Sequence, residues 1–186
     1  MQKGTSMSLY ALTVPTFTQL LNGLSAQLDK ASEWAKTAGK SNDELMDTRL
    51  SEDMLPLSSQ VRFVCGQARD SAAKLTGKDM PAIPEDIVAF DALKQLVAET
   101  LTLLGDLTED DFAGDEDAMV ELTIPNGMVF DLTRAQYARD WALPQIYFHA
   151  TTAYAIMRHL GVELGKMDFV GHMLRYFRAP AEQPAA

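Results

Sequence analysis

The sequence predicts an all-α protein, an up-and-down four-helix bundle with a small β-hairpin inserted before the fourth helix and a short C-terminal helix. Apolar residues recur every three or four positions over four long segments, a spacing that places them on one side of a helix. Only 11 glycines and 8 prolines interrupt the 186 residues. Amphipathic segments of this kind bury their apolar sides against one another.

The first helix is expected from about Pro15 to about Lys40. Pro15 suits a first turn, where a missing N–H is not needed. One apolar stripe follows it, formed by Phe17, Leu20, Leu21, Leu24, Leu28, Ala31, Trp34 and Ala35.

The second helix is expected from about Asp53, with Pro56 in its first turn. Gly77 can adopt the left-handed conformation that ends a helix. A proline-rich connector, PAIPEDI, comes next. The third helix then runs from about Phe90 to about Gly105, where its apolar spacing stops.

Two short β-prone runs, residues 119–124 and 128–132, flank Asn126 and Gly127. An Asn-Gly pair supplies the positive φ that a tight hairpin turn needs, so a β-hairpin is expected here.

The fourth helix is expected to begin after Thr133, because Gln136 lies three residues later, as in a capping box. It should run to about His159 and end at Gly161. Pro144 lies inside it and should bend it.

A short helix is expected over residues 168–177. A hydrophobic fraction of 47% and the few breakers favour one compact domain, residues 8–180. Residues 1–7 and 181–186 are expected to be flexible ends.

The net charge of −10 opposes contact with nucleic acid or an anionic membrane. Much of the excess is in one acidic connection, residues 106–117, which we interpret as a solvated loop. A calcium site is the alternative, but this run lacks the glycine and the closing glutamate of the calcium-binding loop.

Cys65 is the single cysteine, so no internal disulfide can form. With no apolar leader behind a basic segment, we expect a cytoplasmic protein. The apolar run over residues 141–160 contains Pro, Gln, His, Thr and Arg, which favours a buried helix over a membrane span. Cys65 is expected to be a small buried side chain.

Three segments carry a family resemblance: FHATTAYAIMRHLGVELGKMDFVG, YALTVPTFTQLLNGL and DMLPLSSQV. Together they resemble an uncharacterised bacterial family of the DinB/YfiT-like superfamily of metal-binding four-helix bundles. The resemblance covers nearly the whole chain. It implies a left-handed bundle, a homodimer and no established activity for this branch.

Relatives in that superfamily hold a divalent metal, often nickel or zinc, between three histidines on the second and fourth helices. The resemblance places Gln60, Gln145 and His149 at those positions. One imidazole and two amides bind a divalent ion more weakly than three imidazoles. No cofactor is therefore predicted firmly, and zinc or nickel at His149 stays open.

His149 has three interpretations. The favoured one is a core histidine hydrogen-bonded to a neighbour, because a polar ring in an apolar helix needs a partner. The others are a pocket residue that orients a ligand or acts as a general base, and a metal ligand. If His149 faces a cavity, we expect a pocket of His149, Gln145, Gln60, Thr152 and Trp141.

The remaining polar residues near the C-terminus have structural interpretations. His159 is expected to lie at the negative end of the fourth helix, and His172 to be a surface or packing residue. Asp168 is expected to cap the short helix while Lys166 is solvated, with a Lys166–Asp168 contact as the alternative.

Two functional classes follow. The favoured one is a small-ligand-binding or interaction protein with a degenerate metal site around His149, because a three-histidine set is missing. The alternative is a divalent-metal-dependent enzyme, similar to a thiol transferase or a hydrolase, that uses His149 with other ligands. Whether the protein is an enzyme stays open, as does a purely structural role.

Overall fold

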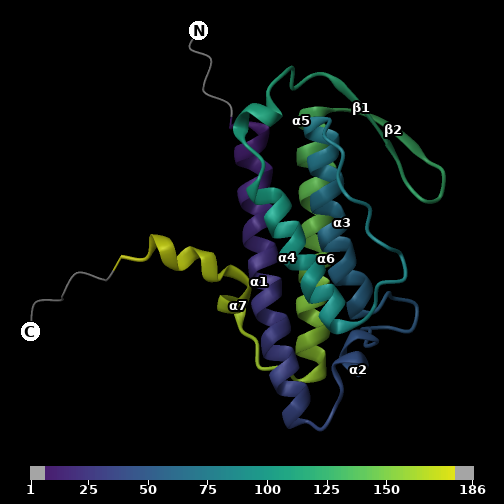
Figure 1. The fold of residues 1–186 in the computed structure, drawn as a ribbon, viewed down its shortest axis with the longest axis vertical. Coiled ribbons are helices and arrows are strands. Elements are labelled where there is room, and N and C mark those ends of the chain that lie inside the picture. The colour runs from purple at the N-terminus through teal and green to yellow at the C-terminus, as the bar shows by residue number, and fades with distance from the viewer. Residues whose placement is uncertain (1–6, 179–186) are drawn as a thin grey trace, which may run out of the picture.

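The computed structural model describes residues 7–178. As predicted, these residues form mostly helices and one small antiparallel hairpin (Figure 1). The elements are α1 Leu9–Thr37, α2 Asn42–Met46, α3 Leu57–Thr76, α4 Phe90–Gly105, the 3-10 turn η1 Glu109–Phe112, β1 Met119–Thr123, β2 Val129–Thr133, α5 Arg134–Gln136, the π-helical turn η2 Tyr137–Ala142, α6 Leu143–Leu160, α7 Lys166–Val170 and the 3-10 turn η3 Gly171–Tyr176. The predicted flexible ends fall outside the described range, except for Met7.

The four long helices lie side by side around one core (Figure 1). α3 packs most extensively against α6 and α4, and α1 packs against α4 and α6. The apolar stripes predicted from the spacing supply this core, which includes Leu21, Leu28, Val61, Val64, Leu93, Val97, Ile146 and Ile156. Among residues 7–178, no helix has both the length and the apolar character needed to cross a membrane.

The helix directions differ from the predicted up-and-down alternation, because α3 and α4 run the same way (Figure 1). The connector, residues 77–89, runs back along α3, where Arg69 Nη1 donates to the Pro81 carbonyl at 3.2 Å. An extended connector of this length reaches roughly 40 Å. The 20 residues of α3 rise only about 30 Å. The connector can therefore carry the chain back to the level at which α3 begins, and α4 starts from there.

α1 begins at Leu9, well before the predicted start at Pro15. Ser8 provides the N-cap, because its hydroxyl accepts a hydrogen bond from the Ala11 N–H at 3.2 Å. Pro15 therefore lies inside the helix and not in its first turn. Ser8 is the sequence signal for this helix start, whereas the prediction relied on Pro15.

α2 was not predicted, although a capping box marks its start. The Ser41 hydroxyl accepts from the Glu44 N–H, and the Glu44 carboxylate accepts from the Ser41 N–H. α3 begins at Leu57 and not at Asp53, with Pro56 directly before it. It ends, as predicted, at Gly77 with a φ of 70°.

The hairpin pairs Leu122 with Phe130, and the positive φ of its turn is at Gly127. The predicted capping box of Thr133 and Gln136 is present, and Gly161 ends α6 with a φ of 100°.

The sequence predicts a bend at Pro144, and the structure shows the π-helical turn η2 directly before it. The Leu143 N–H donates to the Ala138 carbonyl, five residues earlier. Pro144 has no N–H to continue an α-helical ladder, so the widened turn lies directly before it.

Arg134 joins the acidic connection to α3. Its Nη2 donates to the carbonyls of Leu75 at 2.5 Å and Phe112 at 2.9 Å, and its Nη1 to those of Ala113 and Asp115. The side chain is buried, so these carbonyls compensate for the lost hydration of the guanidinium. Leu75 belongs to the last turn of α3, where the helix dipole favours a cation.

The predicted C-terminal helix is divided into α7 and η3. Asp168 accepts the Gly165 N–H at 2.7 Å, so it caps α7 from inside its first turn. Its partner is Lys30, with Nζ and Oδ1 2.6 Å apart, and not Lys166. Side chains two apart on a helix do not face each other, which excludes the alternative of a Lys166–Asp168 contact.

Candidate functional site

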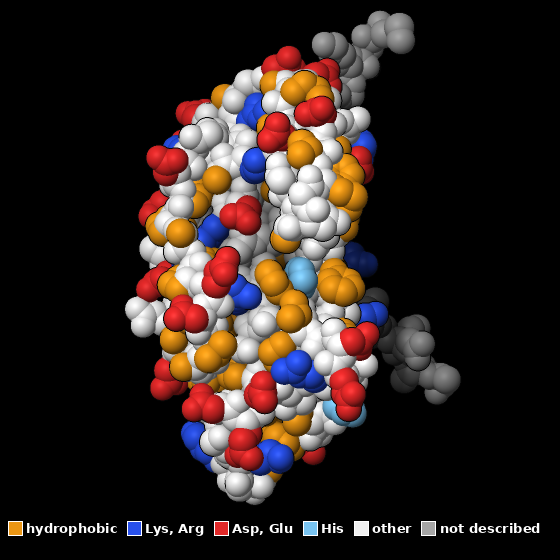
Figure 2. All heavy atoms as spheres, turned by 90° about the vertical axis from the view of Figure 1, so that its right-hand side faces the viewer, with side chains coloured by type: hydrophobic (Ala, Val, Ile, Leu, Met, Phe, Trp, Pro, Cys, Tyr) orange, Lys and Arg blue, Asp and Glu red, His pale blue; other side chains and the backbone are white. Residues whose placement is uncertain are grey.

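A groove of about 810 Å³ lies between α3, α6 and the hairpin. Figure 2 shows this side of the molecule, where hydrophobic side chains gather around a histidine ring beside a hollow. The walls combine aromatic, amide and charged side chains, among them Phe63, Gln67, Asp70, Lys74, Leu122, Tyr137, Trp141, Gln145 and His149. Lys74 fastens the hairpin to α3, because its Nζ donates to the Glu121 carbonyl at 2.6 Å.

Gln60 and His149 form a hydrogen bond across the α3–α6 contact. The distance between His149 Nδ1 and Gln60 Oε1 is 2.8 Å. The Gln60 amide nitrogen donates to the Leu55 carbonyl at 3.2 Å, which turns its oxygen toward the imidazole. Gln60 therefore accepts the bond, and the proton of a neutral His149 is on Nδ1.

The other ring nitrogen, Nε2, remains a hydrogen-bond acceptor. Within residues 7–178, Nε2 has no hydrogen-bond partner. It is also not one of the fully buried side-chain atoms, so solvent can reach it. His149 lines the groove, so Nε2 is accessible there. Burial lowers the pKa of His149, which keeps the ring neutral at pH 7 and its Nε2 lone pair available.

Aromatic contacts fix the plane of the His149 ring. Phe63 stacks on it with ring centroids 4.8 Å apart, and Phe148 meets it edge-on at 5.2 Å. With one nitrogen bonded to Gln60 and one face covered, the ring has little freedom to turn.

Of the five residues predicted for the pocket, the structure brings four together. Gln145 and Trp141 line the groove with His149, and Gln60 supports the imidazole from behind. Thr152 does not take part, because it is buried and its hydroxyl donates to the Phe148 carbonyl at 2.7 Å.

Sequence reasoning missed the polar residues beside these. Gln67 Nε2 donates to the Ser71 hydroxyl at 3.2 Å, and burial raises the pKa of the Tyr137 phenol. Burial also raises the pKa of the Asp70 carboxyl, against the opposing effect of Lys74. The missed signal was a second stripe on α3, in which Gln60, Phe63, Gln67 and Asp70 recur at three- and four-residue spacing.

The residues at this site do not fit a divalent metal. The amide oxygen of Gln60 is engaged with His149 and its amide nitrogen with Leu55. In the described part of the chain, no group of three His, Cys, Asp or Glu side chains is placed to hold an ion. One imidazole nitrogen with neutral amides is a weak donor set for zinc or nickel.

The remaining candidates lie elsewhere. His159 is exposed at the end of α6, where the Arg158 guanidinium donates to the Val162 carbonyl at 3.0 Å. His172 is half-buried beside α1, against a different hollow. Cys65 is buried, and burial raises the pKa of its thiol to about 12.

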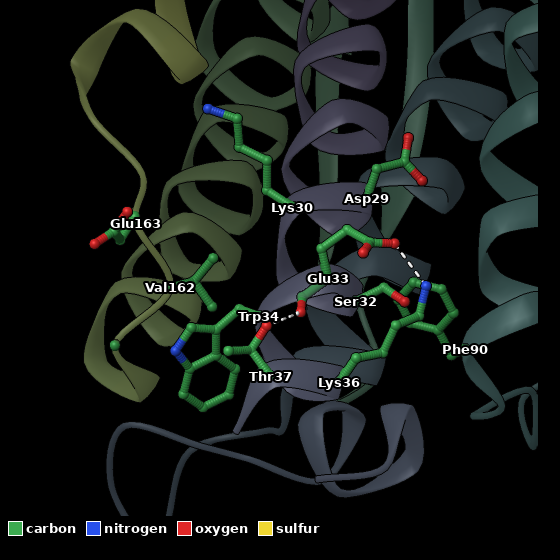
Figure 3. Close-up of a pocket in the computed structure, with 11 residues that line it drawn as sticks. Asp29, Lys30, Ser32, Glu33, Trp34, Lys36, Thr37, Phe90, Val162 and Glu163 are labelled. Atoms are coloured by element: carbon green, nitrogen blue, oxygen red, sulfur yellow. Dashed lines mark hydrogen bonds and ion pairs between the residues drawn. The ribbon is translucent and has the colours of Figure 1, made fainter. Parts of the chain in front are cut away.

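A larger hollow of about 1020 Å³ lies at the C-terminal end of α1 (Figure 3). Most of its charged groups are paired with close neighbours: Lys36 contacts Glu33 at 2.6 Å, and Asp29 contacts Lys94 at 2.7 Å. Most of these side chains are exposed to solvent, where such pairs hold little free energy. We therefore assign the candidate site to the His149 groove.

Comparison with known proteins agrees with this fold. Residues 9–170 match a protein family described as a domain of unknown function, DUF1993. A crystal structure described as a DinB family member protein from Shewanella denitrificans has 37% sequence identity and a TM-score of 0.82. The match covers 92% of this chain and 96% of that one. No curated protein matches the chain.

Proposed function

The chain belongs to the DUF1993 family, and we propose that it is a small-ligand-binding protein whose ligand occupies the His149 groove. The observation that carries the proposal is the neutral, oriented imidazole of His149, which presents an unprotonated Nε2 to the groove. A ligand that donates an N–H or O–H to this atom would gain a directed hydrogen bond.

The groove walls narrow the chemical class. Trp141 and Phe63 offer apolar contact, while Gln145 offers both amide donors and acceptors. The volume is within the range of small-molecule sites. We therefore propose an uncharged ligand with a planar apolar part and a polar hydrogen that His149 accepts.

The same proposal accounts for Gln60 and Gln145, which stand at two of the three positions where the resemblance implies metal-binding histidines. We assign the long helices to a four-helix bundle of the DinB type, in which the Gln60–His149 hydrogen bond stands where metal-binding relatives hold an ion. The bond keeps the imidazole oriented without a metal. A cytoplasmic location belongs to the proposal, because the single cysteine is a buried thiol.

The test is an NMR screen of uncharged aromatic and heteroaromatic fragments against the isotope-labelled chain. We expect binding fragments to shift the signals of Trp141, Gln145 and His149. The shifts should weaken with His149→Gln and persist with His159→Gln, a matched change at an exposed histidine. Fragments that bind both variants equally would contradict the proposal.

The metal content of the protein distinguishes this proposal from the alternative, a divalent-metal-dependent enzyme. Elemental mass spectrometry on tag-free protein, after dialysis against zinc or nickel, should find no ion that depends on His149. About one ion per chain in the wild type that is lost with His149→Gln would replace the ligand-binding proposal with a metal-dependent enzyme.

A further inference from the structure

The carboxylate of Asp70 lines the His149 groove without a partner of its own. Within residues 7–178 it takes part in no ion pair and no hydrogen bond. Lys74, one turn later on α3, is placed to pair with it. The Lys74 Nζ instead donates to the Glu121 carbonyl at 2.6 Å, where it holds the hairpin. Both oxygens of Asp70 are therefore free to accept hydrogen bonds from a molecule in the groove.

Neighbouring groups already remove part of the hydration of this carboxylate. Asp70 lies at the edge of the groove, and burial raises the pKa of its carboxyl against the opposing effect of Lys74. The charge of Asp70 adds to the burial that raises the pKa of the Tyr137 phenol, which stays protonated at pH 7. N–H donors on a ligand would replace the hydrogen bonds that the carboxylate has lost from water.

The charges that line the groove favour an uncharged donor at this end. Asp70 and Asp79 are balanced there by Lys74 and Lys78. A cation would be attracted by Asp70 but repelled by Lys74 one turn away. A carboxylate accepts two parallel N–H bonds, one on each oxygen. An amino group next to a ring N–H supplies such a pair of donors without a positive charge.

His149 and Asp70 mark two ends of one binding surface. The His149 ring stacks on Phe63 with centroids 4.8 Å apart. Asp70 follows Phe63 by seven residues on α3, which is a rise of roughly 10 Å. A hydrogen bond occupies roughly 3 Å at each end. The remaining length fits a small planar ring system that carries donors on opposite edges.

On the basis of the function proposed for the groove, we propose that Asp70 is a second anchor for its ligand, and that this ligand is an amino-substituted planar heterocycle. Its edge at Asp70 carries an amino group beside a ring N–H, and its opposite edge carries the N–H that His149 accepts. The 2-amino-6-oxopurine ring of guanine has this pattern. The protonated Tyr137 phenol can donate to the oxo group next to the ring N–H.

Equilibrium dialysis of the full chain with radiolabelled guanine and hypoxanthine tests the assignment. Hypoxanthine lacks only the amino group, so the pair isolates one donor. We expect the wild type to bind guanine about 10–100-fold more tightly, as a hydrogen bond to a charged group allows.

Three variants separate the two anchors. Asp70→Asn should abolish the preference for guanine, because an amide has one acceptor oxygen and not two. Asp53→Asn, at an exposed acid before α3, is the matched control and should keep the preference. His149→Gln should weaken both purines by a similar factor and leave their ratio unchanged. Asp70 is exposed, so Asp70→Asn should keep the thermal midpoint in circular dichroism.

Equal binding of the two purines to the wild type, lost with His149→Gln, would overturn the role of Asp70 and leave the ligand-binding function of the groove standing. A preference for guanine that survives Asp70→Asn would overturn that role as well. If neither purine binds, the ligand class is wrong, whereas the groove itself is tested by whether fragment binding depends on His149.

Discussion

His149 Nδ1 lies 2.8 Å from Gln60 Oε1, although the two residues are 89 positions apart in the chain. The contact joins α6 to α3 and leaves Nε2 as the acceptor that faces the groove. Both the chemistry proposed for the groove and the poor fit to a metal follow from this one hydrogen bond.

Replacing the Gln60 amide with a carboxylate should change the charge of His149. A negative group at hydrogen-bond distance favours the imidazolium, so Gln60→Glu should raise the pKa of His149 by about 1–3 units. In the wild type, nitrogen-15 NMR at pH 7 should show the proton on Nδ1. A wild-type ring protonated on Nε2, or an unchanged pKa with Gln60→Glu, would contradict the assigned geometry.

Stability should fall as the pH drops through the range in which an unfolded histidine titrates. The pKa of folded His149 is below the ordinary value of about 6.5. As the pH falls below that value, the unfolded chain takes up a proton that the folded chain refuses, so the free energy of unfolding decreases. The decrease ends once the pH passes the pKa of folded His149.

Urea unfolding over this pH range gives the measurement. His149→Gln should remove the part of the pH dependence of the free energy of unfolding that comes from the imidazole. His159→Gln should keep it. The same pH dependence of unfolding for the wild type and His149→Gln would contradict the lowering of the His149 pKa by burial.

Cys65 should not react in the folded protein. Burial raises the pKa of its thiol to about 12, so almost no thiolate forms near pH 8 and reagents have no access. Reaction with a chromogenic disulfide should require denaturant, with a rate that follows the unfolded fraction. Rapid modification of the folded chain would show that α3 is not packed as described.

Removing the Arg134 side chain should loosen the connection between α4 and α6. Arg134→Met leaves the carbonyls of Leu75 and Phe112 without their donor, and we expect a loss of at least about 2 kcal/mol in the free energy of unfolding. Hydrogen exchange should accelerate in β1 and β2. Arg139→Met, at an exposed arginine, should change stability by less than about 0.5 kcal/mol. Equal effects of the two variants would count against the buried contacts.

Substitution by alanine should change the stability in opposite directions at two helix-end glycines. Gly77 has a φ of 70°, so Gly77→Ala should cost about 1–2 kcal/mol. Gly105 ends α4 without a positive φ and has open space around it, so Gly105→Ala should stabilise by about 0.5 kcal/mol. Thermal unfolding of both variants checks the difference in sign.

The sequence predicted those parts of the fold that depend on local chemistry. The ends of α4, the capping box at Thr133 and the terminating glycines 77 and 161 all depend on residues within one turn of the chain. Pro15 was misread because a proline is tolerated both in a first turn and, at a cost, inside a packed helix.

Helix direction could not be predicted, because a connector of residues 77–89 can either turn back at once or run the length of α3. The candidate site was predicted only in part for the same reason. The family resemblance placed Gln60 and His149 on neighbouring helices, but the Lys30–Asp168 pair and the polar stripe at Gln67 and Asp70 depend on how distant segments dock.

The position of α6 has a consequence for synthesis of the chain. α1 and α3 each bury an apolar face against this helix, which is the last of the long helices to be translated. Until it emerges, those faces have no covering partner, and exposed apolar surface of this kind promotes aggregation. We therefore expect the nascent chain to depend on chaperones until its fourth long helix is complete, and chains that stop before Leu160 to be degraded and not to accumulate as folded fragments.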